Sequence, residues 1–315
     1  MTWLKSFILF SLIFLVGCTY SGNVVKEFNG LTEVYFCPID DCKSVLLREL
    51  NDANDIKCAY YDLDLPDVAE ILVSKRAKLV FDHASSIILN NSVVDPKYSQ
   101  MHNKFCILDG KTILTGSMNP TFRDTSVNYN NFLVFHSIQM ASAYEKEFKQ
   151  MFNGTFSAKK KEVSKIHDFF VNDETVNVYF CPQDWCATKI LYALDTAQES
   201  IYFMTFSFTH DQMGELLVKK HSLGVDVRGL FEKSQNNDYS EFPRLNASGI
   251  PIKWEATGAN LHHKVFIIDK KIVVTGSMNP SLNGDTSNDE NVVIIHDEEL
   301  ALSFYNEFER IYGKL

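Results

Sequence analysis

The stretch His102–Pro120 reads HNKFCILDGKTILTGSMNP, and the stretch His262–Pro280 reads HHKVFIIDKKIVVTGSMNP. The two are identical at 11 of 19 positions without a gap, and both end in the hexapeptide TGSMNP. The likeness continues at the same offset of 160 residues, where Asn128–His136 matches Asn288–His296. Similarity at a fixed spacing indicates a duplicated unit, so the chain is predicted to contain two repeats.

Each half has the same order of apolar patterns. The sequence VYFCP occurs upstream in both halves and is followed by an amphipathic helix, a second strand, a further helix and a short apolar strand. The motif strand, a tight return, another strand and a closing helix complete the unit. Alternating strands and helices indicate an α/β sheet covered on both faces. The first three predicted elements are 34–36, 44–53 and 56–61 in one half, and 178–180, 187–197 and 201–208 in the other.

The motif places several polar side chains on one face of a predicted hairpin. His102 and Lys104 are two positions apart and share a strand face, whereas Asn103 points the other way. Ser117 and Asn119 share a face of the returning strand, and the glycine before them allows a close backbone approach. With their counterparts in the second half, the candidate residues are His102, Lys104, Gly116, Ser117, Asn119, His262, Lys264, Gly276, Ser277 and Asn279.

This set of side chains suits a tetrahedral phosphate. Lysine supplies a fixed positive charge, and serine and asparagine donate hydrogen bonds to phosphoryl oxygens. Cleavage through a covalent intermediate needs a nucleophile on one side of phosphorus and a proton donor for the leaving oxygen on the other. The repeat therefore predicts one active site at the interface of the two halves, with His102 and His262 in line.

The pattern H-x-K-x4-D-x6-G-S-x-N, present twice, resembles the signature of the phospholipase D superfamily, and the likeness covers nearly the whole chain after residue 30. The resemblance implies two pseudo-symmetric repeats that form an α/β/α sandwich with mixed central sheets, a phosphohistidine intermediate, and no metal or organic cofactor. Its aspartates, Asp109 and Asp269, point away from the histidine and lysine face and are predicted to be structural. Because both motifs lie in one chain, we expect activity as a monomer without an obligatory protein partner.

The two halves differ where the family usually places a carboxylate. The second half has Glu290 at this position, and the first half has Asn130. We expect Glu290 to reach the far ring nitrogen of His262, and Asn130 to hold the same place relative to His102. A carboxylate raises the basicity of an imidazole and stabilises the cation formed on phosphorylation. His262 is therefore predicted to be the nucleophile and His102 the general acid.

Composition and charge bear on the substrate. The chain has 315 residues, is 45% hydrophobic and carries a formal net charge of −10, which disfavours a large nucleic-acid footprint. We expect hydrolysis of a phospholipid to phosphatidic acid and a head-group alcohol. A metal-independent nuclease of the same superfamily is the alternative, favoured by the compact length. A phosphatidyltransferase is a further alternative, because it uses the same catalytic groups. A degenerate binding protein is disfavoured because neither half has lost its histidine or lysine.

Residues 1–23 are predicted to be an export signal and anchor region. Lys5 gives a positive start, residues 7–16 are an apolar run broken only by Ser11, and Leu15–Cys18 resembles a bacterial lipoprotein signal, in which the cysteine is lipidated. An uncleaved anchor is the alternative, although the run is short for a membrane-spanning helix. Either way, we expect the body outside the cytoplasm, attached to a membrane of the cell envelope.

Six cysteines remain after Cys18. Cys37 and Cys42 have the same spacing as Cys181 and Cys186, which predicts one local disulfide in each half of an exported chain. A zinc site with four cysteines is the alternative, although four intervening residues is a wide ligand spacing.

The other two cysteines, Cys58 and Cys106, align with Phe203 and Phe266 in the second half. Positions that hold phenylalanine in the equivalent place of the second half are expected in the core. Both cysteines are therefore predicted to be buried free thiols.

The predicted organisation has four parts: the signal and anchor region at 1–23, the first repeat at 24–156, a linker at 157–172 and the second repeat at 173–315. The linker begins with SAKKKEVSK. Its lysines are predicted to be solvated, because no aromatic or second basic cluster accompanies them.

Overall fold

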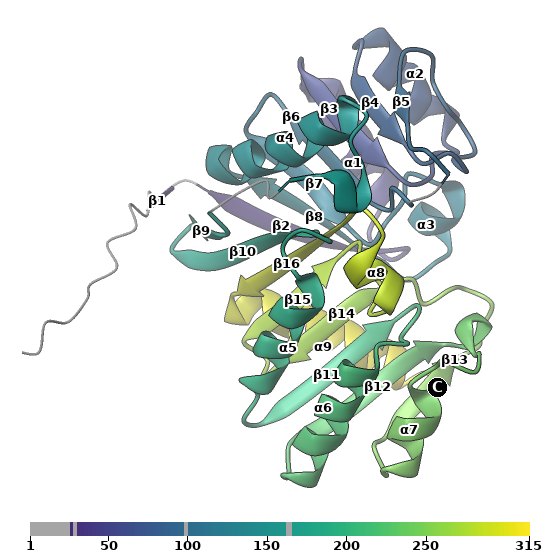
Figure 1. Cartoon of the computed structure of the whole chain (residues 1–315), viewed down its shortest axis with the longest axis vertical. Helices are drawn as coiled ribbons and strands as arrows, with labels where there is room; N and C mark the ends of the chain where they lie inside the picture. Colours follow the sequence, from purple (N-terminus) through teal and green to yellow (C-terminus); the bar gives the residue numbers. More distant parts are fainter. Residues whose placement is uncertain (1–25, 28–29, 98–99, 162–165) are drawn as a thin grey trace, which may run out of the picture.

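The computed structural model of the chain describes residues 26–27, 30–97, 100–161 and 166–315, so the predicted signal and Cys18 lie outside the described residues. Two mixed sheets form the centre of the molecule, and helices cover both faces of each sheet (Figure 1). This is the predicted α/β class with two repeats. No helix within the described ranges is both long enough and apolar enough to cross a membrane.

The first repeat is built on a seven-stranded sheet with the order β2-β8-β7-β6-β3-β4-β5. The β3–β4 and β4–β5 pairs are parallel, and the remaining pairs are antiparallel. Its elements are β2 (Leu31–Cys37), α1 (Cys42–Asp52), β3 (Ile56–Tyr60), α2 (Pro66–Ser74), β4 (Lys78–Phe81), β5 (Val93–Val94), β6 (Lys104–Leu108), β7 (Thr112–Gly116), α3 (Phe122–Ser126), β8 (Asn130–His136) and α4 (Ile138–Phe152).

The second repeat has the same order in β10-β16-β15-β14-β11-β12-β13, and β1 and β9 extend this sheet at one edge. Its elements, with β1, are β1 (Lys26–Glu27), β9 (Asp168–Val171), β10 (Glu174–Cys181), α5 (Cys186–Asp195), β11 (Ser200–Thr205), α6 (Asp211–Ser222), β12 (Asp226–Glu232), α7 (Phe242–Ala247), β13 (Ile252–Glu255), β14 (Lys264–Ile268), β15 (Ile272–Gly276), α8 (Leu282–Thr286), β16 (Glu290–His296) and α9 (Glu298–Tyr312).

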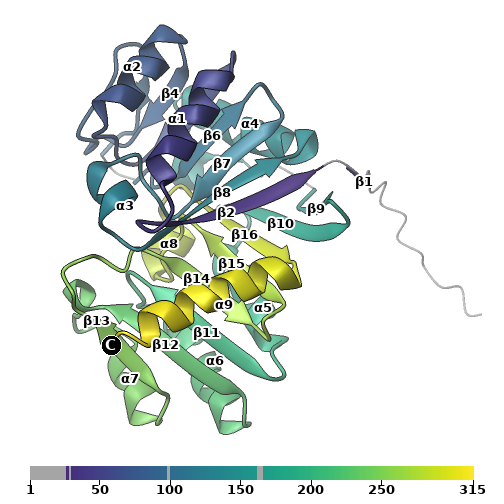
Figure 2. The ribbon, with the colours of Figure 1, turned by 180° about the vertical axis from the view of Figure 1, so that it is seen from behind.

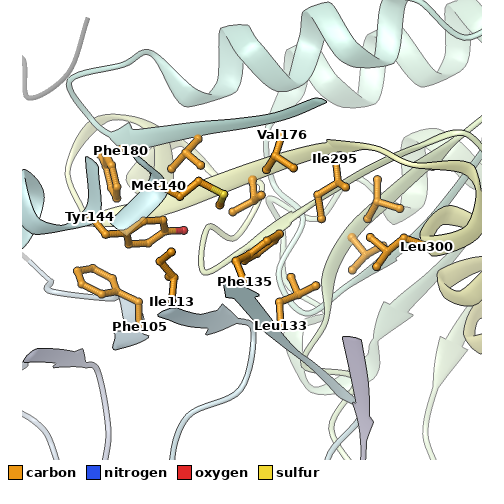
Figure 3. Close-up of a cluster of buried hydrophobic side chains, with 14 of the residues drawn as sticks. Phe105, Ile113, Leu133, Phe135, Met140, Tyr144, Val176, Phe180, Ile295 and Leu300 are labelled. Atoms are coloured by element: carbon orange, nitrogen blue, oxygen red, sulfur yellow. The ribbon is translucent and has the colours of Figure 1, made fainter. Parts of the chain in front are cut away.

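Side chains of the motif strands alternate between two cores, which explains why these strands are apolar throughout. In β6, Phe105 and Ile107 face a core that both repeats share, whereas Cys106 and Leu108 face α1 and α2. Helices α4 and α9 also contribute to the shared core (Figures 1 and 2). Figure 3 shows this core, in which Tyr144 of the first repeat packs between Phe105 of the same repeat and Phe180 of the second, and Phe135 lies farther along it. Buried apolar surface therefore joins the repeats.

The hairpin between β6 and β7 has the predicted tight turn. Asp109 and Gly110 have φ of 51° and 63°, a conformation that glycine and aspartate tolerate best. The Asp109 carboxylate accepts hydrogen bonds from the backbone N–H groups of Asn54 and Asp55 at 2.9 and 2.8 Å. Asp269 accepts three backbone hydrogen bonds in the same place in the second repeat. Both aspartates thus bind backbone N–H groups at or just before the start of the neighbouring strand.

The segment at 157–172 differs from the predicted solvated linker. Strand β9 pairs with β10 and with β1, so this segment contributes a strand to the second sheet. The side chain of Lys160 is fully buried, and its ammonium pairs with Glu147 of α4 and with Asp289, the latter at 2.8 Å. Glu147 and Asp289 come from different repeats, so the linker contributes a buried ion cluster between them.

Three disulfides are present among the described residues. Cys37–Cys42 and Cys181–Cys186 are the two predicted local links. The prediction of free thiols at Cys58 and Cys106 is wrong, because these residues face each other across β3 and β6 and are linked. Their phenylalanine counterparts are opposite each other across β11 and β14, so the alignment of the repeats was correct. The phenylalanines at the equivalent positions of the second repeat gave no indication that the two cysteines face each other.

Candidate active site

The two motif histidines lie just before β6 and β14, where the repeats meet. The backbone N–H of His102 donates to the carbonyl of Asp289, and that of His262 donates to the carbonyl of Tyr129, both at 2.9 Å. Each histidine is thus fixed by the backbone of the opposite repeat. Both rings are largely buried, with residue exposures of 6% and 9%. The interface predicted from the repeat is therefore where the histidines are found.

Each motif lysine bonds back to the carbonyl of its own histidine. Lys104 Nζ donates to the His102 carbonyl at 2.8 Å, and Lys264 Nζ donates to the His262 carbonyl at 2.6 Å. An ammonium group has three donors, so this bond fixes its position and leaves further donors for a phosphate. Both lysines are buried.

The motif serines orient the residues beside the histidines. Ser117 Oγ donates to Asn130 Oδ1 at 3.0 Å, and Ser277 Oγ donates to Glu290 Oε2 at 2.6 Å. Both hydroxyls are fully buried, and each also accepts a backbone N–H from β8 or β16. Their contacts are therefore those of orienting residues. The side-chain oxygens of Asn119 and Asn279 are buried and have no protein partner among the described residues.

Gly116 and Gly276 permit the close approach that the sequence predicted, and the approaching group is a neighbouring strand. Their φ values are 127° and 132°, which L side chains rarely adopt. A Cβ atom at Gly116 would lie 2.5 Å from the carbonyl oxygen of Asn131, and one at Gly276 would lie 2.3 Å from that of Asn291. These contacts bring Ser117 and Ser277 next to Asn130 and Glu290.

The predicted pairing of Glu290 with His262 is wrong. Nδ1 of His102 lies 2.8 Å from both carboxylate oxygens of Glu290, and Nδ1 of His262 lies 2.8 Å from Asn130 Oδ1. Each orienting residue thus reaches across to the histidine of the other repeat. The physical reason is the exchange of backbone bonds at the interface, which places the start of β16 beside His102 and the start of β8 beside His262.

Burial and the two lysines determine the ionisation of the site. Burial, with the charges of Lys104 and Lys264, holds the pKa of His102 well below its usual range. Burial also lowers the pKa of His262 to about 4 and that of Lys104 to about 8. The pKa of Lys264 is well below its usual range, because burial and the charge of Lys104 both oppose its protonation. Two lysines and two histidines thus share one buried space with the carboxyl groups of Glu290 and Asp124, and a phosphate would add further negative charge beside the lysines.

Buried amides connect the repeats behind the site. Thr115 donates to Asn291 Oδ1 at 3.1 Å, and Thr275 donates to Asn131 Oδ1 at 3.0 Å, so the two contacts are equivalent. Asn131 also contacts Nδ1 of His263 at 3.1 Å. His263 therefore faces away from the lysines.

The structure adds residues that the motifs did not indicate. The rings of Tyr61 and Phe206 pack edge-on against His102 and His262, with centroids 4.7 and 4.9 Å apart. Each ring also lies under the lysine of its own motif. Both residues directly follow a strand at equivalent places in the repeats, which is the signal that could have found them. Asp124 of α3 lies beside His262 and had no signal in the motif.

The fold and site together define a class of protein. The chain belongs to the phospholipase D-like family, since the family model described as "Cardiolipin synthase, PLD-like domain" matches residues 64–152 and 190–312. The match includes both motifs. A solved structure, the phosphatidylserine synthase of Haemophilus influenzae, covers 90% of this chain with a TM-score of 0.67 at 12% identity, which shows the shared fold.

Among curated proteins, the chain is similar to a phospholipase D of Rickettsia conorii, with 35% identity over 130 residues, and to the mitochondrial cardiolipin hydrolase of Canis lupus familiaris, also with 35% identity over 130 residues. These matches cover 41% and 40% of this chain. They span 65% of the Rickettsia protein and 50% of the canine protein.

Proposed function

We propose that this protein is a phosphodiesterase that forms a phosphohistidine intermediate, with both histidines and both lysines in one site. The observation that carries the proposal is that Nδ1 of His102 and Nδ1 of His262 are each held by a side chain of the opposite repeat. Holding Nδ1 fixes each ring and leaves Nε2 for the reacting phosphate. Lys104 and Lys264 supply positive charge for the phosphoryl oxygens.

The hydrogen bonds of Asn130 support His262 as the nucleophile. Asn130 Nδ2 donates to the backbone oxygen of Asp124 at 3.2 Å, and Oδ1 accepts from Ser117, so Oδ1 is the atom that meets His262. An amide oxygen only accepts, and therefore Nδ1 of His262 carries a proton and Nε2 keeps its lone pair. With a pKa of about 4, the ring is neutral at pH 7.

The Glu290–His102 pair supports His102 as the general acid. Burial raises the pKa of Glu290 to about 8, although Lys104 and Ser277 oppose the shift. At pH 7 the pair therefore holds one proton between Nδ1 and the carboxylate and a second proton on Nε2 of His102. We therefore keep His262 as the proposed nucleophile and His102 as the proposed acid, although the reason given from the sequence is wrong, because Glu290 contacts His102 and not His262.

The reaction then proceeds in two balanced steps. In the first, the Nε2 lone pair of His262 attacks phosphorus, the bond from phosphorus to the leaving oxygen breaks, and Nε2 of His102 gives its proton to that oxygen. In the second, His102 takes a proton from water, the water oxygen attacks phosphorus, and the bond from phosphorus to His262 breaks. An alcohol in place of water gives transfer by the same steps.

A phospholipid is the proposed substrate, and a nucleic acid is the alternative. The two curated relatives named above are a phospholipase D and a cardiolipin hydrolase. The net charge of −10 also disfavours a polyanionic substrate. A pocket of about 810 Å³ opens beside the end of the second motif, where Thr209 donates to the Pro280 carbonyl. Its ionisable lining consists of four carboxyl groups, one arginine and one histidine: Asp211, Asp238, Glu241, Asp285, Arg244 and His210.

The substrate test compares labelled phospholipid vesicles with DNA and RNA, using the soluble part of the chain from about residue 24 in the presence of EDTA. Release of the head-group alcohol supports the proposal, and cleavage of nucleic acid alone supports the alternative. The chelator matters because three residues of types that bind metal ions lie close together outside the motifs: Asp82, His83 and Asp95. Asp82 is near enough to Lys104 to act on its charge. Loss of turnover in EDTA that a divalent metal restores would overturn the metal-independent mechanism.

The assignment of the nucleophile has its own test. Substrate is mixed with the enzyme, the reaction is quenched in acid, and the phosphopeptide is mapped by mass spectrometry. Phosphate is expected on His262. Phosphate on His102 would reverse the proposed roles.

We also propose that the protein acts outside the cytoplasm, attached to a membrane through lipid on Cys18. The lipoprotein-like sequence that ends at Cys18 and the three disulfides support this location. A Cys18→Ala variant should keep residues 1–17 and lose the lipid. Mass spectrometry of the mature N-terminus distinguishes lipidation from an uncleaved anchor.

A further inference from the structure

Asp124 is a buried carboxylate of α3 at the edge of the site. Its exposure is 4%, and Oδ2 lies 3.3 Å from Nδ1 of His262. The same oxygen accepts the backbone and side-chain N–H groups of Asn119 at 2.9 and 2.8 Å, and Oδ1 accepts from Asn128 at 2.7 Å. Burial opposes its ionisation, but the His262 ring and these hydrogen bonds hold the pKa of Asp124 well below its usual range. Asp124 is therefore a negative charge directed at His262.

The two repeats differ in the position that supplies a carboxylate to the opposite histidine. At the offset of 160 residues, Asn130 corresponds to Glu290, and Asp124 corresponds to Gly284. His262 thus lies beside Asp124 and Asn130 of the opposite repeat, whereas His102 lies beside Glu290, so the carboxylate comes from a different position in each repeat. A Cβ atom at Gly284 would lie 2.5 Å from the carbonyl oxygen of Asn279, so that position has no room for an aspartate.

A pair of equivalent asparagines identifies the two carboxylates as counterparts. Asn128 and Asn288 occupy the same position in the two repeats. Asn128 donates to Asp124 at 2.7 Å, and Asn288 donates to Glu290 at 3.2 Å. In each repeat, this asparagine therefore donates to the carboxylate that lies beside the histidine of the other repeat.

We propose that Asp124 is the positioning carboxylate of His262 and takes the place of the charge that Asn130 lacks. The proposal rests on the proposed function, in which His262 becomes a phosphorylated cation. Asn130 fixes the ring tautomer but adds no charge, whereas Asp124 stabilises the imidazolium as phosphorus binds to Nε2. The other charged groups that act on His262 are Lys264 of β14 and Lys104 of β6, and both oppose a cation there.

The test asks whether activity lost with the Asp124 carboxylate returns when the first repeat is given the residues of the second repeat. Asp124→Asn removes the charge but keeps the size, and the double variant Asp124→Gly/Asn130→Glu gives the first repeat the residues of the second. The loss of kcat expected for Asp124→Asn is about 10- to 100-fold with little change in KM, the size typical of residues that orient a reacting group. The double variant should recover most of the kcat. Thermal unfolding of each variant measures any loss of folding separately.

A second readout does not need turnover. The pKa of His262, followed by NMR of ¹⁵N-labelled histidine, should fall in Asp124→Asn and return toward the wild-type value in the double variant. An unchanged titration in Asp124→Asn would overturn the role of Asp124, and so would full activity of that variant or failure of the folded double variant to recover. Absence of wild-type turnover on bis(4-nitrophenyl) phosphate and on the vesicles would instead overturn the proposed function, while the NMR result still decides the role of Asp124.

Discussion

Nδ1 of His102 lies 2.8 Å from both carboxylate oxygens of Glu290, which belongs to the other repeat 188 positions later. The corresponding contact of His262 is with the neutral Asn130. The two imidazoles of one site therefore have different partners, a carboxyl group and an amide, although the motifs that carry them are nearly identical. We propose that this difference gives the two histidines different tasks.

Glu290→Gln should weaken the general acid. A glutamine at this position cannot share a second proton with His102. Proton transfer to the oxygen of a poor leaving group therefore becomes slow. We expect a loss of about 100-fold in kcat on an ester of an alkyl alcohol, and a clearly smaller loss on a 4-nitrophenyl ester, which leaves without a proton. Steady-state rates on the two substrates measure this. His262→Asn is the control and should be inactive on both, and an equal loss on the two esters for Glu290→Gln would contradict the prediction.

The pH profile of kcat/KM should have a plateau between about pH 4 and about pH 8. Below the pKa of about 4, His262 is protonated and loses its lone pair. Near pH 8, two groups lose protons that the reaction needs, because the pKa values of Glu290 and Lys104 are both about 8. The basic limb should therefore be steeper than that of a single group in the wild type, and it should have the slope of a single group in Glu290→Gln. A wild-type activity that keeps rising above pH 9 would exclude this assignment.

The Cys58–Cys106 disulfide should stabilise the fold more than the local links do. It joins residues 48 positions apart, whereas Cys37–Cys42 joins residues 5 apart. Loop-closure entropy gives about 4 kcal/mol for the longer link and about 2 kcal/mol for the shorter one. Urea unfolding of the Cys58→Ser/Cys106→Ser and Cys37→Ser/Cys42→Ser variants compares them. Non-reduced peptide mapping should show the 58–106 link, and free thiols at both sites in exported protein would contradict it.

Lys160→Met should destabilise the protein by about 3–5 kcal/mol at pH 8, because it leaves Glu147 and Asp289 buried without a cation. Burial already raises the pKa of Glu147 to about 7, and removal of Lys160 raises it further. The remaining carboxylates therefore take up protons as the pH falls, so the loss should be smaller at pH 5. Urea unfolding at both pH values measures this, with the exposed Lys161→Met as the control. An equal cost for the two variants would show that the buried cluster contributes little.

The sequence was sufficient for features that depend on local patterns. The duplicated motif predicted the two repeats and the shared site. The alternation of apolar and polar residues placed His102 with Lys104 on one strand face, and Asp109-Gly110 predicted the turn. These predictions succeed because strand alternation and turn conformation depend on residues that are close along the chain.

Tertiary structure decided which residues face each other across the interface. Glu290 lies at the start of the strand that would serve His262 if each repeat were self-contained, but backbone bonds between the repeats bring it to His102. The same packing brings Asp124 to His262 and buries Lys160 between the repeats, and strand register places Cys58 opposite Cys106. Register and the docking of one repeat on the other result from burial of the whole shared core, so no short stretch of sequence specifies them.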